Sequence, residues 1–120
     1  MTAAALRRWC LARPGATEEF PFGERTSVFK VGGKMFALSS LKSRPLSVSV
    51  KCDPELASQL RAAYPAIRPG YHLNKRHWNT ITLDGSLDDK TVFDMLEDSY
   101  DLVRANASPG RSRRTERRGP

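Results

Sequence analysis

The chain has 120 residues, a formal net charge of +7 and a hydrophobic content of 39%. This length fits one domain with one modest core, and the apolar runs are too short to span a bilayer. Residues 1–9 lack the charged start and the long apolar stretch of a signal peptide, so we expect a cytoplasmic protein.

The charge is unevenly distributed along the chain. Residues 25–76 hold ten Lys and Arg against two acids, which gives this segment a charge of +8. Residues 77–105 hold two cations against seven acids, for a charge of −5, and residues 106–120 return to +4. A molecule polarised in this way attracts a polyanion to one side, although the same charges also serve ordinary solubility.

The start of the chain predicts a helix and a connector. Apolar residues at helical spacing indicate a helix over residues 3–13, which Pro14-Gly15 ends. In the connector that follows, Phe20 and Phe22 flank a proline. We expect both rings to pin the connector to the core.

The next segment is typical of a half-buried antiparallel sheet. Residues 26–31 and 34–41 predict two strands, and Gly32-Gly33 between them favours a tight hairpin turn. After a polar loop over 40–45, apolar and polar residues alternate over 46–52. Strict alternation indicates a strand with one buried face and one face in water.

A second helix should follow at once. Asp53 is suited to cap its first turn, and Pro54 fits the first helical position. Pro65 ends the helix. Its predicted buried stripe consists of Leu56, Leu60 and Tyr64.

The remaining elements are a loop, a strand, a helix and a tail. Residues 67–77 begin with turn-forming residues and predict a loop, and residues 78–84 predict a strand. Ser86, with an acid three residues later, resembles the capped start of a last helix that runs to about residue 105. Residues 106–120 hold five arginines and no large apolar side chain, so we expect disorder there. The predicted buried face of the last helix consists of Val92, Leu96, Ser99, Tyr100 and Val103.

These elements predict an α+β domain over residues 1–105. Its antiparallel sheet should have about four or five strands, with helices packed on it. The Arg-rich tail, residues 106–120, would add non-specific phosphate attraction or no specific function.

The chain shows little sign of catalysis or of a cofactor. His72 and His77 lie five residues apart without a neighbouring acid or Cys, so they predict neither a metal site nor a catalytic pair. Cys10 and Cys52 fall in apolar patterns and predict buried thiols. Gly32-Gly33 lacks the other residues of a phosphate-binding loop. We therefore expect a protein that is not an enzyme and binds no metal or cofactor.

The basic middle segment favours a nucleic acid as the partner. Two projections, the Gly32-Gly33 hairpin and the loop over 40–45, could act as wings whose cations contact phosphates. Nothing in the sequence identifies base-reading residues. The candidate nucleic-acid-binding residues are Lys30, Lys34, Lys42, Arg44, Lys51, Arg68, Lys75 and Arg76.

Two alternatives belong to other classes of protein. In the first, Tyr71, His72, His77 and Trp78 surround a pocket, and the cations recognise a small anionic ligand or the rings stack on a planar one. Trp78 could equally anchor the core, and each histidine could simply make hydrogen bonds in the loop. In the second, the basic face and the acidic last helix bind protein partners.

Five segments of the chain resemble the MmcQ/YjbR family, and the resemblance covers about residues 6–105. It implies a frataxin-like (CyaY-like) topology, and a DNA-binding function with a double-wing arrangement. It implies no catalytic residues. The matching segments are 14–15 with 21–23 (PG and PFG), 31–37 (VGGKMFA), 51–55 (KCDPE), 69–79 (PGYHLNKRHWN) and 99–103 (SYDLV).

Overall fold

A computed structural model describes residues 1–107. Within them, three helices accompany one antiparallel sheet of six strands in the order β1-β2-β3-β4-β6-β5. The helices are α1 (Ala3–Leu11), α2 (Pro54–Ala63) and α3 (Asp89–Ala107). The strands are β1 (Thr17–Glu19), β2 (Ser27–Val31), β3 (Lys34–Ser39), β4 (Ser47–Lys51), β5 (Ile67–Pro69) and β6 (Trp78–Thr82).

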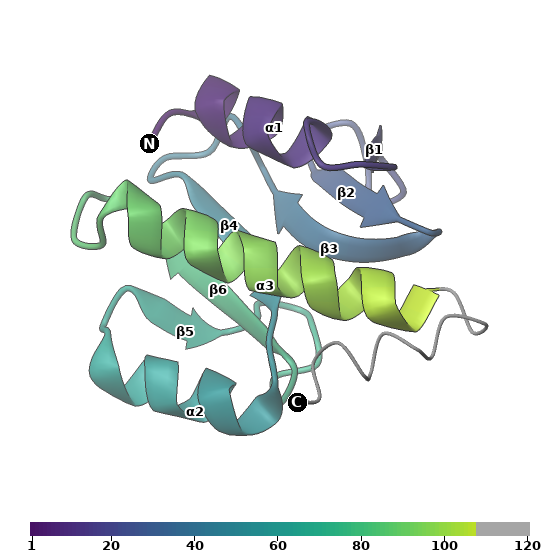
Figure 1. The fold of residues 1–120 in the computed structure, drawn as a ribbon. Coiled ribbons are helices and arrows are strands. Elements are labelled where there is room, and N and C mark those ends of the chain that lie inside the picture. The colour runs from purple at the N-terminus through teal and green to yellow at the C-terminus, as the bar shows by residue number, and fades with distance from the viewer. Residues whose placement is uncertain (108–120) are drawn as a thin grey trace.

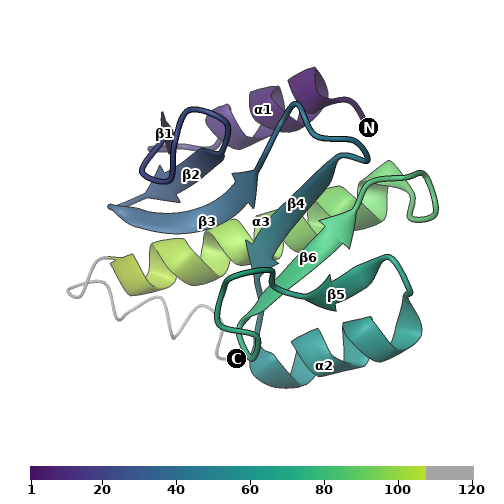
Figure 2. The same cartoon turned by 180° about the vertical axis from the view of Figure 1, so that it is seen from behind.

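The helices leave one face of the sheet open. α3 crosses the other face and packs against β2, β3 and β4 (Figure 1). α1 lies beside it, where Trp9 stacks on Phe93 of α3. α2 packs against β5 and β6 at one edge. Seen from behind, only loops lie in front of the strands (Figure 2). None of the helices in residues 1–107 is long and apolar enough to cross a membrane.

The core lies between α3 and the sheet. The Ser99 hydroxyl is fully buried there, donates to the Phe36 carbonyl at 2.6 Å and accepts from the Lys51 N–H at 2.8 Å. One side chain thus joins α3 to both β3 and β4. The predicted periodic face of this helix is confirmed by the burial of Val92, Leu96, Ser99, Tyr100 and Val103.

The α+β class is confirmed, but the sheet has more strands than predicted. The Gly32-Gly33 hairpin is confirmed, because Val31 pairs directly with Lys34. β1 and β5 were missed, since each has only three residues and alternation cannot develop over so short a segment. The frataxin-like topology stays a prediction.

The second helix begins as predicted, but its buried face differs. The Asp53 carboxylate accepts from the Glu55 and Leu56 N–H groups and caps the helix. The predicted apolar stripe is right only for Leu60, which is partly buried against the core. Leu56 and Tyr64 are exposed, and Ala57 is the fully buried residue of α2. The helix packs only at the edge of the sheet, so a small side chain suffices at the contact.

The last helix begins at a different cap and runs further than predicted. Asp88 Oδ1 accepts from the Thr91 N–H, so Asp88 provides the cap and not Ser86. The helix continues to Ala107, and the first two residues assigned to the tail therefore belong to it. The rest of the predicted tail, residues 108–120, lies outside the described residues.

Candidate ligand-binding site

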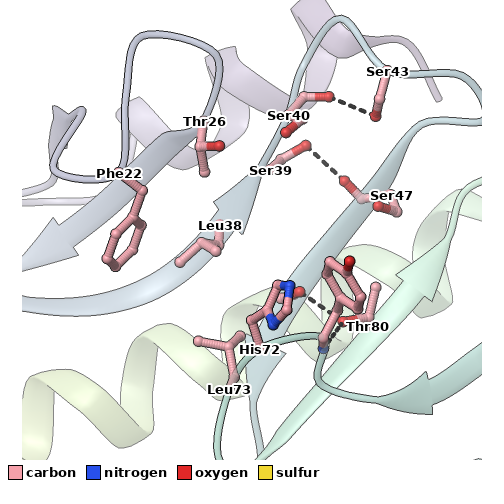
Figure 3. Close-up of a pocket in the computed structure, with 12 residues that line it drawn as sticks. Phe22, Thr26, Leu38, Ser39, Ser40, Ser43, Ser47, His72, Leu73 and Thr80 are labelled. Carbon is pink, nitrogen blue, oxygen red and sulfur yellow. Dashed lines mark hydrogen bonds between the residues drawn. The ribbon is translucent and has the colours of Figure 1, made fainter.

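A cavity of about 440 Å³ opens on the uncovered face of the sheet. Phe22 lies on one side of it and His72 and Leu73 on the other, with Leu38 between them (Figure 3). Its walls come from the β1–β2 turn, the β3–β4 loop and the loop after β5. It is lined by Phe22, Thr26, Leu38, Ser39, Ser40, Ser43, Ser47, Ser49, Tyr71, His72, Leu73 and Thr80.

Small side chains from three strands form the floor. Paired residues share one face of a sheet, so the pairs Leu38–Ser49 and Ser49–Thr80 place three side chains in one row. Ser49 Oγ and Thr80 Oγ1 lie 2.7 Å apart and share a hydrogen bond. Ser39 Oγ donates to the Ser47 carbonyl at 2.6 Å. The floor is therefore uncharged, with hydroxyl groups beside the apolar Leu38.

Two rings form the wall beside β6. The Tyr71 side chain is 73% exposed, and its ring centroid lies 4.0 Å from that of His72. The Tyr71 N–H donates to Thr80 Oγ1 at 3.2 Å, which ties this wall to the floor. His72 has a φ of 59°, a left-handed conformation that costs a non-glycine residue about 1–3 kcal/mol. The wall thus consists of exposed rings on a strained but anchored backbone.

The loop that carries these rings, residues 70–77, folds on itself. The Gly70 N–H donates to the Trp78 carbonyl at 2.8 Å, and the Trp78 N–H donates to the Asn74 carbonyl at 2.9 Å. The Lys75 ammonium donates to the Gly70 carbonyl at 2.9 Å. A Cβ at Gly70 would lie 2.7 Å from the Cβ of Trp78. The loop is a compact turn that needs glycine at its first position.

Arg61 holds this loop against α2. Its guanidinium donates to the Lys75 carbonyl at 3.0 Å and to Asn79 Oδ1 at 2.9 Å. The buried Asn79 amide donates in turn to the Ala57 carbonyl at 3.4 Å. Arg61 is thus a positioning residue for the cavity wall. This role was not predicted from the sequence, because nothing there distinguishes Arg61 from an ordinary surface arginine on a helix.

The opposite wall comes from the connector between α1 and β2, and its two phenylalanines do not lie where they were predicted. Phe20 and Phe22 do not pack into the core, and Phe22 is 62% exposed. The connector forms the edge strand β1 and then a turn in which the Gly23 N–H donates to the Phe20 carbonyl. This turn projects past the sheet, so its rings stay outside the core and Phe22 faces the cavity.

Of the four predicted ligand residues, two lie at the cavity. Tyr71 and His72 line it, whereas His77 and Trp78 do not. Trp78 is 7% exposed beneath the loop that starts at Gly70, so its ring cannot stack on a ligand. Trp78 is therefore buried, but it lies beneath this loop on the open face of the sheet and not in the core between α3 and the sheet. His77 is half-buried, and its carbonyl accepts from the Cys52 N–H at 2.7 Å.

The predicted basic residues are divided between the two ends of β3. Lys34 begins β3, and Lys51, at the end of the antiparallel neighbour β4, lies at the same end of the sheet. Lys42 and Arg44 follow the other end of β3. The two proposed wings therefore project from opposite ends of one strand.

The other predicted cations differ in their surroundings. Lys30 forms an ion pair with Glu19 at 3.0 Å, and the Lys75 ammonium is bound to the backbone of its own loop. Arg76 is exposed in that loop. Arg68 pairs with Thr80 across the β5–β6 ladder, so its side chain lies on the open face beside the cavity floor.

The cysteines do not contribute to this site. Both are buried and free, as predicted, and burial raises the pKa of the Cys10 thiol to about 12. Burial also raises the pKa of the Cys52 thiol. Neither is therefore an effective nucleophile at neutral pH. In residues 1–107, no group of three or more His, Cys, Asp or Glu side chains could hold a metal ion.

Most residues of the floor were also not predicted as site residues, although the alternation of apolar and polar residues pointed to two of them. The alternation over 46–52 placed Ser47 and Ser49 together on the face away from the core. That face was predicted to meet water. Ser49 is instead buried, because loops from distant parts of the chain rise around it. Alternation reveals which residues share a face and not what encloses that face.

Fold and cavity together define a small α+β protein with helices on one face of an antiparallel sheet and a ligand-sized cavity on the other. The YjbR family model matches residues 11–102, and the chain belongs to the YjbR family. The resemblance noted in its sequence is thereby confirmed.

Relatives with known sequences and structures agree with this assignment. Uncharacterized protein YjbR of Escherichia coli (strain K12) is 40% identical over 101 residues, which cover 83% of this chain and 85% of the relative. Uncharacterized protein YbdF of Escherichia coli O157:H7 is 38% identical over 98 residues, or 81% and 80% of the two chains.

Two solved structures share the fold. A Deinococcus radiodurans protein with the family-model domain DUF419 superposes with a TM-score of 0.87 at 42% identity, over 95% of this chain and 86% of its own. A Pseudomonas syringae protein gives a TM-score of 0.75 at 29% identity, over 87% and 100%. None of these names states a ligand or a reaction.

Proposed function

We propose that the protein binds a small organic molecule in the cavity on the open face of its sheet. The observation that carries this proposal is the grouping of three rings, those of Phe22, Tyr71 and His72, around an uncharged hydroxyl floor. Exposed apolar groups gathered in a hollow are typical of ligand sites. A volume of about 440 Å³ lies within the range of small-molecule pockets.

The backbone beneath the rings supports the same proposal. His72 keeps its strained φ of 59° because bonds from Tyr71 to Thr80 and from Arg61 to the loop fix the segment. Strain that is held in this way is common at ligand sites. The proposal is one of binding without catalysis. The His72 imidazole lines the cavity, but no acid, Cys, Lys or Arg stands among the lining residues to form a catalytic pair with it.

Titration of a small-compound library, followed by ¹⁵N NMR, tests the proposal. Compounds that bind should shift the amide signals of Leu38, Tyr71 and Thr80. Tyr71→Ala should weaken binding roughly five- to tenfold, because one ring wall is lost. Tyr64→Ala, which removes an exposed ring at the end of α2, should change nothing. If no compound shifts signals around the cavity, the proposal is wrong.

A second candidate function is the binding of nucleic acid. It is favoured by the position of Arg68 and Lys51 on the same open face as the exposed rings. Bases could stack on the rings while the cations contact phosphates. Fluorescence anisotropy with single- and double-stranded oligonucleotides, at about 50 and about 200 mM salt, tests this function. No binding at the lower salt concentration would remove it.

A further inference from the structure

Unpaired cations flank the chain segments that line the uncharged cavity. In the chain, the charged residues directly next to lining residues are Arg25, Lys42 and Arg44, and no acid takes such a position. Arg68 adds a fourth cation, because it pairs across the strands with Thr80 of the floor. We call these four residues the basic rim.

The basic rim is free to meet a ligand. All four of its residues are exposed. Within the described residues none of their side chains makes an ion pair or a hydrogen bond, whereas Lys30 and Lys90 both have carboxylate partners. Glu24, next to Arg25, is the nearest acid along the chain and makes no ion pair within residues 1–107. The rim therefore has a net positive charge that the protein leaves unneutralised.

From the uncharged cavity and the basic rim beside it, we infer that the ligand is a planar ring that carries an anionic group, such as an aromatic carboxylate. The inference rests on the proposed function and names its ligand class. The ring enters between Phe22 and the Tyr71–His72 pair, and the anionic group stays at the mouth, beside the basic rim.

The energetics of charge burial favour this orientation. An ion deep in the cavity would lose its hydration and would find only hydroxyl groups, which do not replace it. At the mouth, the same ion keeps part of its hydration and attracts guanidinium or ammonium groups. A cationic ring would be repelled by the basic rim. A neutral ring would bind through the walls and floor alone.

Three compounds with the same bicyclic ring test the inference, since 2-naphthoate, 2-naphthamide and 2-naphthamidine carry planar substituents of similar size that are anionic, neutral and cationic. Binding is followed by ¹⁵N NMR at low salt. We expect naphthoate to bind about five- to tenfold more tightly than naphthamide, and naphthamidine most weakly. The preference for the anion should fall as salt is added, because charges at the rim are screened.

Variants of the basic rim locate the effect. Arg68→Gln and the pair Lys42→Gln with Arg44→Gln should reduce naphthoate binding and leave naphthamide binding unchanged. Lys90→Gln, a cation on α3 on the other face of the sheet, is the matched control and should alter neither. Because the rim side chains are exposed and make no hydrogen bond or ion pair within the described residues, these variants should fold normally.

The outcomes separate the inference from the proposed function. If naphthamide shifts the cavity signals and binds as tightly as naphthoate, the anionic class is wrong while the binding site stands. The same conclusion holds if no rim variant lowers naphthoate affinity. If none of the three compounds, and no member of the library, shifts signals around the cavity, the proposed function itself fails.

Discussion

At the scale of single residues, the cavity wall depends on two backbone positions. Gly70 lies so close to Trp78 that no side chain fits there. His72 takes a left-handed conformation that glycine would adopt more easily, yet its ring lines the cavity and contacts Tyr71. The first position permits the compact loop, and the second sacrifices some stability to place a ring at the site.

Replacement of Gly70 by Ala should destabilise the protein, whereas Ser58→Ala on the exposed side of α2 should leave its stability almost unchanged. The new methyl group at Gly70 would collide with Trp78, a close contact that costs about 1–3 kcal/mol of unfolding free energy. Urea denaturation of both variants measures the difference. A Gly70→Ala variant as stable as the Ser58→Ala control would mean that the loop does not pack on Trp78 as described.

At the scale of elements, one carboxylate ties α1 to the first two strands. Glu18 on β1 accepts from Arg7 Nε of α1 at 2.9 Å and from Ser27 Oγ of β2 at 2.7 Å, and its side chain is 11% exposed. Burial opposes its ionisation, but the bonds from Arg7 and Ser27 outweigh burial and lower the pKa of this carboxyl below its usual value. The ionised form therefore stabilises the fold.

The replacement Glu18→Gln should lower stability at neutral pH and have less effect in acid. Because the folded-state pKa is lowered, the stabilisation by Glu18 is complete above the unfolded-state pKa and is lost as the pH falls through the folded-state pKa. We expect a loss of about 1–2 kcal/mol at neutral pH, typical of hydrogen bonds to a charged group. Thermal melts from neutral pH to about pH 3 measure it, since the unfolded Glu titrates near 4.3. A difference that is constant over this range would contradict the account.

Also at the scale of elements, the sequence predicted individual helices, turns and caps better than the tertiary contacts around them. The Gly-Gly hairpin, the Asp53 cap and the buried face of α3 each follow from a local rule, and each was confirmed. The two three-residue strands and the exposure of Phe22 depend instead on contacts beyond the local segment, such as the pairing of β1 with β2 and of β5 with β6. The same holds for Arg61, whose bonds reach residues 14 and 18 positions away.

At the scale of the whole molecule, the polarity seen in the sequence takes a different form in three dimensions. The positive segment does not make one continuous wall, because Lys34 and Lys42 lie at opposite ends of β3. Helices cover one face of the sheet, and the open face carries an uncharged cavity whose lining segments are flanked by unpaired cations. Net charge along a sequence predicts attraction to anions and leaves the shape of the anion open.

The measurement that tests the central claim most directly is the observation of intermolecular NOEs between 2-naphthoate and the protein. We predict contacts from the ring protons of the ligand to the Leu38 methyl groups and to the rings of Phe22 and Tyr71. Contacts to residues elsewhere, such as the exposed groups of α2, with none to Leu38 or Phe22, would contradict the assignment of the cavity as the binding site.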